Sequence, residues 1–209
     1  MEVNVKYRKD EGDLLDDPTI YRYLVGSLIY LTISHPDISY VIHHVNQFMS
    51  SPRHLHIVVV RRIIRYLRGS PTRGLFFPTG SSLQLIGYSD ADWVGCLDTR
   101  RSTTGRCMFL GDALLFWRCK KQDHVYKSST EAEYRAMPTA CSEIVWLRGF
   151  LAKLEFLPIP LHVDNTSTIQ IATNPVFHEH TKHIEVDCHS NRDSLDNRVI
   201  SLPYISSDF

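Results

Sequence analysis

The chain has 209 residues, 43% of them apolar, which suffices for one sizeable hydrophobic core or for a domain with a helical appendage and excludes a disordered polypeptide. Lysine plus arginine and aspartate plus glutamate both number 23, so the net charge alone indicates no class of partner. The five cysteines are odd in number and include no Cys-x-x-Cys pair, which predicts buried thiols in a reducing compartment instead of a disulfide framework.

Residues 1–17 are predicted to form a polar N-terminal tail. This segment lacks the basic and apolar regions of a signal peptide, and no apolar run of the chain approaches the length that spans a membrane. We therefore expect a soluble intracellular protein, cytoplasmic or nuclear, without a membrane partner.

Residues 18–80 are predicted to be helical. Apolar residues at helical spacing predict a first helix that ends before Pro36, a second from Pro36 to about residue 50, and a third from Pro52 to Gly69. On the third helix, Arg61, Arg65 and Arg68 share a face that differs from the apolar stripe, and residues 38–89 contain no acidic residue. This basic face is either solvated or a contact for a nucleic-acid backbone.

Turn signals occur at residues 70–71 and 78–80. Beyond them, the helical spacing of apolar residues is replaced by the alternation of apolar and polar residues that is typical of strands, which places a domain boundary near residue 80. Ser128 and Glu131 form the signature of a capping box at the start of a long helix. Strands are predicted at 83–93, 102–110 and 113–119, in a short segment reaching Val163, and at 199–203, and helices at 128–154, 166–173 and from about 182. This order predicts an α/β fold with a mixed sheet.

Four carboxylates stand at the ends of the strand-like runs or near the starts of the helix-like ones: Asp90, Glu133, Asp164 and Glu185. Open α/β sheets gather carboxylates around a divalent metal at such positions. In-line hydrolysis of a phosphodiester needs an activated water and a neutralised leaving oxygen, which two Mg²⁺ ions about 4 Å apart provide. The pattern therefore favours metal-dependent cleavage of nucleic acid over four unrelated surface residues.

Several ordered motifs resemble the ribonuclease H domain of copia-type LTR retrotransposon Pol polyproteins. Residues 23–31, 35–40 and 65–69 are similar to the helical end of the reverse transcriptase that precedes this domain in the family. The ribonuclease H motifs are Tyr-Ser-Asp-Ala-Asp-Trp (88–93), Thr-Arg-Arg-Ser-Thr-Thr-Gly (99–105), Lys-Lys-Gln (120–122), Ser-Ser-Thr-Glu-Ala-Glu-Tyr-Arg-Ala (128–136), Val-Asp-Asn (163–165), Asn-Pro-Val-Phe-His (174–178) and Thr-Lys-His-Ile-Glu-Val-Asp-Cys-His (181–189).

The resemblance implies a ribonuclease H-like mixed five-stranded sheet flanked by helices over residues 81–209, preceded by a small helical subdomain. Residues 18–80 would be a thumb- or connection-like segment of the reverse transcriptase. The polymerase palm is absent, so the chain would be a fragment of a Pol polyprotein, with the missing polymerase part as a possible partner.

The resemblance also implies the roles of the acidic residues. Asp90, Glu133 and Asp164 would be metal ligands, and Glu131 fits the helix cap better than the metal site. The fourth ligand would be Glu185, with Asp187 as its substitute. The cofactor would be Mg²⁺, two ions per site, and Mn²⁺ could replace it.

The histidine-rich segment before Glu185 allows two interpretations. His178 and His183 are the candidates for the family histidine that assists proton transfer or product release. Zinc is the alternative, because His and Cys are its ligands, but the spacing fits no Cys₂His₂ pattern, so we expect no zinc.

The substrate implied by the family is an RNA/DNA hybrid, which is read by its shape and not by its sequence. Contacts to its phosphates and hydroxyls are expected from polar and basic residues of the second half of the chain, in addition to the three arginines of the basic helix. These residues are Arg100, Arg101, Ser102, Thr103, Lys120, Lys121 and Asn165.

Pro138 departs from the family pattern inside the predicted helix 128–154. A proline there removes a backbone donor and costs about 3 kcal/mol. The alternative to an active enzyme is therefore a catalytically inactive relic or nucleic-acid-binding module with the same fold. An integrase or transposase core shares the metal chemistry, but the motif around Glu133 favours ribonuclease H.

Overall fold

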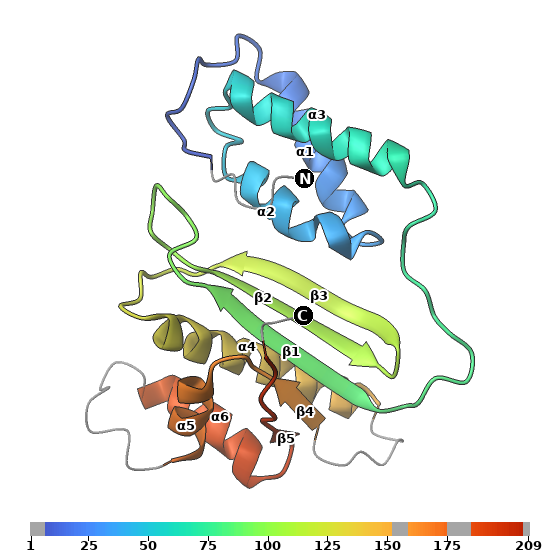
Figure 1. Ribbon diagram of the computed structural model, residues 1–209, viewed down its shortest axis with the longest axis vertical. Coiled ribbons are helices and arrows are strands. Elements are labelled where there is room, and N and C mark those ends of the chain that lie inside the picture. Colours follow the sequence, from blue (N-terminus) through green and yellow to red (C-terminus); the bar gives the residue numbers. More distant parts are fainter. Residues whose placement is uncertain (1–6, 152–158, 175–184, 207–209) are drawn as a thin grey trace. The chain divides into compact units, whose positions relative to one another are not determined.

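The computed structural model describes residues 7–151, 159–174 and 185–206, and for 185–190 the backbone alone. The helices are α1 (Thr19–Leu31), the 3₁₀-helix η1 (Pro36–Ile38), α2 (Ser39–Asn46), α3 (His54–Gly69), α4 (Ser129–Phe150), α5 (Thr166–Thr173) and α6 (Glu185–Asp196). The strands are β1 (Leu85–Asp92), β2 (Thr103–Leu110), β3 (Ala113–Lys121), β4 (Ile159–His162) and β5 (Ile200–Ser201) (Figure 1). The chain divides into two compact units: the residues up to Phe76 together with Cys96–Arg100, and the remainder.

The first unit is a group of helices around its own apolar core. Val25 of α1 and Val60 and Ile63 of α3 are buried in this core, and the buried hydroxyl of Tyr21 donates a 2.6 Å hydrogen bond to the carbonyl oxygen of Val45. The apolar stripe predicted for the third helix is confirmed by this packing.

The second predicted helix is wrong in its extent. It is divided into η1 and the shorter α2, which ends at Asn46. The N–H groups of Gln47, Phe48 and Met49 bond carbonyl groups three residues earlier, so the chain tightens into turns at this point.

The second unit is built on a mixed five-stranded sheet of order β3-β2-β1-β4-β5. The pairs β1–β2 and β2–β3 are antiparallel, whereas β4 runs parallel to both β1 and β5. Helices flank this sheet, and α4 packs along β1 (Figure 1). The predicted fold class, a mixed five-stranded α/β sheet with flanking helices, is confirmed.

Helix α4 begins as predicted and is continuous through Pro138. The side chain of Ser128 accepts the N–H of Glu131 at 3.1 Å. The carboxylate of Glu131 in turn accepts the N–H of Lys127 at 3.0 Å, one residue before the position that a capping box would use. The helix ends at Phe150, four residues before its predicted end.

The last strand is shorter than predicted. Only Ile200 and Ser201 pair with β4, opposite Ile159 and Pro160. Pro160 has no N–H to donate and Pro203 follows shortly after β5, so the ladder has few possible bonds at this edge.

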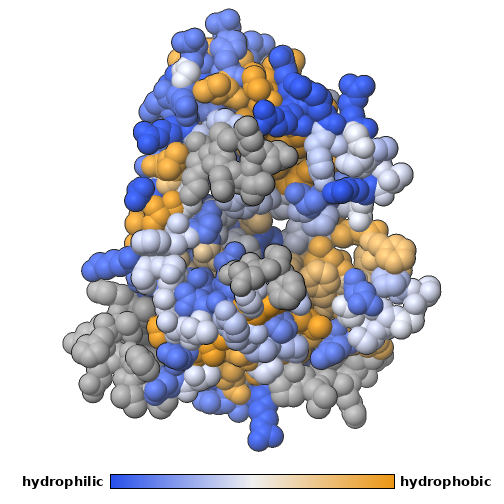
Figure 2. All heavy atoms as spheres, viewed as in Figure 1, coloured by the Kyte–Doolittle hydropathy of each residue, from blue (hydrophilic) through white to orange (hydrophobic). Residues whose placement is uncertain are grey.

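The surface of both units is mixed in character. Figure 2 shows hydrophilic side chains interspersed with apolar ones on the visible face. Among the described residues, no helix is both long enough and apolar enough to cross a membrane.

Candidate metal centre

Asp90 belongs to β1, in which buried and less buried residues alternate. Its neighbours Ser89 and Ala91 are buried, whereas Asp90 points to the opposite side and is exposed. The residue opposite Asp90 on β2 is Gly105, and the space where a Cβ of Gly105 would lie is open. The Asp90 carboxylate is thus accessible to an ion from solvent.

Glu133 is a buried residue in the second turn of α4, with 8% of its surface exposed. Its Oε1 accepts a hydrogen bond of 3.2 Å from the side-chain amide of Asn165. Its Oε2 is buried and has no hydrogen-bond partner among the described residues. A buried carboxylate oxygen without a donor is costly unless a cation or another ligand completes the site.

Asp164 lies just after the end of β4 and follows the buried Val163. Because β4 is parallel to β1, the carboxyl ends of both strands lie at the same edge of the sheet, which brings Asp164 near Asp90. Its Oδ1 is also buried without a hydrogen-bond partner among the described residues.

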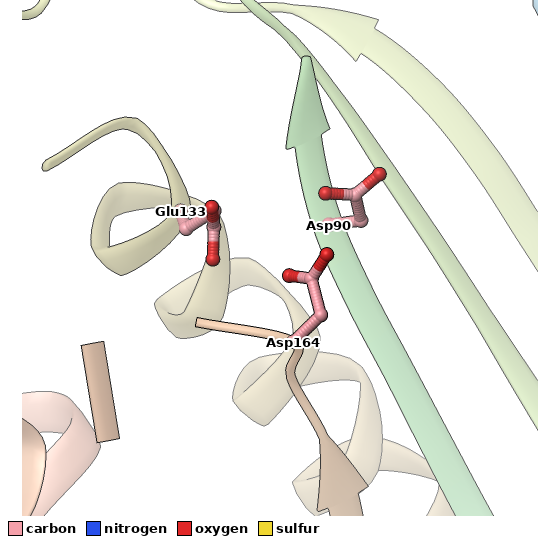
Figure 3. A group of neighbouring side chains, drawn as sticks. All are labelled: Asp90, Glu133 and Asp164. Atoms are coloured by element: carbon pink, nitrogen blue, oxygen red, sulfur yellow. The ribbon is translucent and has the colours of Figure 1, made fainter. Parts of the chain in front are cut away.

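The three carboxylates form one cluster. Each offers an oxygen within 4.8 Å of the others, and Figure 3 shows the side chains converging from β1, α4 and the end of β4. Burial and the adjacent charges of Asp164 and Asp90 raise the pKa of Glu133 to about 7, against the opposing hydrogen bond from Asn165. Partial desolvation of the Asp90 carboxylate by the surrounding protein, together with the charge of Asp164, also raises the pKa of Asp90.

The donor set fits a hard divalent cation. The three carboxylates repel one another as anions, which contributes to the raised pKa values of Asp90 and Glu133, and a cation among them removes this repulsion. Oxygen ligands are those that Mg²⁺, Ca²⁺ and Mn²⁺ prefer. Asp90, Glu133 and Asp164 could therefore hold a divalent metal.

The remaining predicted residues of the centre lie outside the described part. His178 and His183 fall in the segment 175–184, which lies outside the described residues. Glu185 and Asp187 belong to the backbone of α6, but their side chains are also outside the described atoms. Which acid is the fourth ligand stays a prediction.

The predicted nucleic-acid contacts occupy different environments. Arg61, Arg65 and Arg68 are exposed on α3 in the first unit, to which Arg100 also belongs. The basic residues of the second unit are accessible: Arg101 and Lys120 are exposed and Lys121 is half-buried.

Two predicted contact residues are buried in the second unit. Ser102 and Thr103 have 1% and 3% of their surfaces exposed. The Ser102 hydroxyl accepts the N–H of Val94, and the N–H of Thr103 donates to the carboxylate of Asp92. These residues hold the connection between β1 and β2 in its conformation.

Asn165 has a positioning role that sequence reasoning missed. Its amide N–H group donates to Glu133 at 3.2 Å and to the hydroxyl of Thr130 at 3.3 Å, while its carbonyl oxygen accepts the N–H of Thr168 at the start of α5. An asparagine before Thr-Ser-Thr is a recognisable N-cap signal, but the contact with Glu133 follows only from tertiary structure. Asn165 thus fixes α5 and orients one carboxylate of the cluster.

The sheet and the cluster together define an α/β protein with a candidate centre for a divalent metal. No family model matches the chain. It is 41% identical over 199 residues to the retrovirus-related Pol polyprotein from transposon RE1 of Arabidopsis thaliana and 38% identical over 210 residues to that from transposon RE2 of the same plant. These alignments cover 94% and 99% of the chain but only 14% of each relative. The relatives that align with nearly the whole chain are thus retrovirus-related Pol polyproteins of copia-type transposons, and the chain is similar to a segment of them.

Among solved structures, the chain is similar to LC11-RNase H1 in complex with an RNA/DNA hybrid. The TM-score is 0.40 and the identity 15%, over 60% of this chain and 87% of that one.

Proposed function

We propose that the second unit is the ribonuclease H part of the Pol polyprotein and hydrolyses the RNA strand of RNA/DNA hybrids with Mg²⁺. The convergence of Asp90, Glu133 and Asp164 within 4.8 Å carries this proposal. Similarity to a segment of the Pol polyproteins supports it, because the ordered ribonuclease H motifs include these three residues. The rest of the polyprotein is the partner that we expect to help grip the hybrid.

The residues of the cluster would share the work of holding two Mg²⁺ ions, with Mn²⁺ as a substitute. When bound, the ions supply an activated water and neutralise the leaving oxygen of the phosphodiester. Asp90 offers an accessible carboxylate on the rigid strand β1, and Asp164 offers one at the start of the loop after β4. Asn165 holds Glu133 toward them through its amide group.

The inactive relic remains the alternative proposal, motivated by Pro138. Helix α4 nevertheless continues through Pro138, and Glu133 lies within the acidic cluster one turn earlier. This arrangement favours the active enzyme, and a cleavage assay separates the two proposals.

The test is cleavage of an RNA/DNA hybrid labelled on either strand, with Mg²⁺ and with EDTA. We expect cutting of the RNA strand only, and a loss of more than about 100-fold in Asp90→Asn, since even outer residues of metal sites contribute 10- to 100-fold. Asp112→Asn, which alters an exposed carboxylate of the β2–β3 hairpin, should cleave like the wild type. Cleavage that persists in folded Asp90→Asn would refute the assignment of the centre, and no cutting by the folded wild type would favour the relic.

A further inference from the structure

A second charged site lies between the β2–β3 end of the sheet and α4. It is a cavity of about 160 Å³, large enough for a phosphate group with several waters. Four cationic side chains line it, namely Arg106, Lys120, Lys121 and Arg135, against one carboxylate, Asp123. Glu143, which is not part of the lining, pairs with Arg106 at 3.2 Å and offsets its charge. The lining still carries more cations than carboxylates, which favours an anion.

Arg106 is the buried and pre-oriented member of the cavity, with 8% of its surface exposed. Its guanidinium group lies 5.7 Å from the centre of the Phe116 ring and donates to Thr139 at 3.4 Å and to Glu143 at 3.2 Å. Its Nε is buried and has no hydrogen-bond partner among the described residues. A guanidinium group has five N–H donors, and leaving one of them buried without an acceptor costs free energy. The unpaired Nε–H of Arg106 is therefore available to an acceptor on a bound ligand.

The walls of the cavity are fixed by further contacts. The guanidinium of Arg135 stacks over the ring of Tyr126 at 5.6 Å. The side-chain amide of Gln122 donates to the hydroxyl of Thr104 at 2.9 Å and to the carbonyl oxygen of Ala132 at 2.8 Å. Arg135 and Gln122 are therefore already restrained, and they lose little conformational entropy when a ligand binds.

This cavity is separate from the metal centre. Glu133 and Arg135 are two residues apart on α4, which places them about 200° apart around the helix axis. Glu133 therefore faces the cation site while Arg135 lines the anion site.

We propose that this cavity binds a phosphate group, and that its source is a backbone phosphate of the nucleic acid that the metal centre cleaves. Arginine suits this ligand because its planar fork matches phosphate oxygens, and the lysines add point charges at the open side. The assignment of the phosphate to nucleic acid rests on the proposed function. The presence of an anion site does not.

The anion site is tested without metal or nucleic acid, by thermal shift and calorimetry with inorganic phosphate against chloride at equal ionic strength. We expect phosphate to bind and raise the melting temperature. Lys120→Gln should weaken phosphate binding about tenfold, the size of one charged hydrogen bond, and Arg135→Gln should do the same. Lys127→Gln, an exposed lysine outside the cavity, is the matched control. Absence of phosphate binding, or equal weakening in the control, overturns the proposal.

The source is tested by hybrid binding in EDTA over a range of salt concentrations. Loss of one phosphate contact should reduce the slope of log affinity against log salt by about 0.7 to 0.9 in Lys120→Gln. If inorganic phosphate binds but the salt dependence of hybrid binding is the same in Lys120→Gln and the wild type, the ligand is free phosphate. The assignment to a nucleic-acid phosphate would then be wrong. Because the phosphate measurement requires no cleavage, failure of the nuclease assay leaves it intact.

Discussion

Asn165 combines two roles in one side chain, and these roles can be separated by substitution. Asn165→Ser keeps an oxygen that can cap α5 but removes the amide donor to Glu133, whereas Asn165→Ala removes both. We expect Mg²⁺ affinity, measured by calorimetry, to fall 10- to 100-fold in both variants, as for other residues that orient metal ligands.

The loss of the α5 helix cap should change the free energy of unfolding but not the Mg²⁺ affinity. Asn165→Ala should be less stable than Asn165→Ser by about 0.5–2 kcal/mol in urea denaturation. An unchanged Mg²⁺ affinity in Asn165→Ser would show that Glu133 needs no positioning by Asn165.

His56 makes the stability of the first unit dependent on pH. Its ring is buried and stacked on Phe48 with the centroids 3.8 Å apart, its Nδ1 accepts the N–H of Arg53, and its Nε2 lies 3.1 Å from the carbonyl oxygen of Arg8. Burial lowers the pKa of His56 below its ordinary value of 6.5. A protonated ring would also lose its acceptor for Arg53.

The sign of the effect follows from proton binding. Between the lowered folded pKa and 6.5, the unfolded chain binds more protons than the folded one, so the free energy of unfolding falls as the pH drops below about 6.5. In urea denaturation at pH 7.5 and 5.5, His56→Gln should lose part of this dependence, while His54→Gln, an exposed residue of the same helix, should keep it. Identical pH dependence in wild type and His56→Gln would contradict the prediction.

Strand β1 and helix α4 approach each other closely at Gly87. A Cβ at this residue would lie 2.9 Å from the sulfur of Met108 and 3.1 Å from methyl carbons of Ile144 and Leu161, nearer than ordinary van der Waals contact. Gly87→Ala should therefore lower the free energy of unfolding by about 1–3 kcal/mol, the usual range for overpacking a core.

Gly105 on the neighbouring strand β2 provides the matched control. A Cβ there meets no atom within 4 Å, so Gly105→Ala should leave stability unchanged or raise it slightly, because alanine restricts the unfolded chain. Equal losses in the two variants, measured by urea denaturation, would show that the approach of α4 does not require a glycine in β1.

Helix starts marked by a capping residue were predictable from the sequence. Element lengths that depend on packing or strand pairing with distant segments were not. Ser128 caps α4 and Asn165 caps α5, so these starts were predicted correctly. The division of η1 from α2 and the length of β5 depend on packing and on pairing with Pro160, which no local pattern reports.

At the scale of the whole molecule, the sequence predicted the fold class and the three acids that converge. It did so because Asp90 lies near the end of β1 and Asp164 lies just after the end of β4, and both of these strand ends lie at the same edge of the sheet. It could not predict that Ser102 and Thr103 are buried, or that Arg106 pairs with Glu143, 37 residues later. These facts arise from strand register and from which face of α4 meets the sheet.

The two units have separate apolar cores, and all three carboxylates of the candidate centre belong to the second unit. A ligand stabilises the structure that binds it by RT ln(1 + [L]/Kd), about 1.4 kcal/mol at ten times Kd. Mg²⁺ at this concentration should thus slow hydrogen exchange of the most protected amides of β1 and α4 about tenfold, and leave those of α1 and α3 unchanged. Asp90→Asn should abolish the slowing in β1 and α4. Equal slowing in both units would mean that Mg²⁺ acts elsewhere than at the carboxylate cluster.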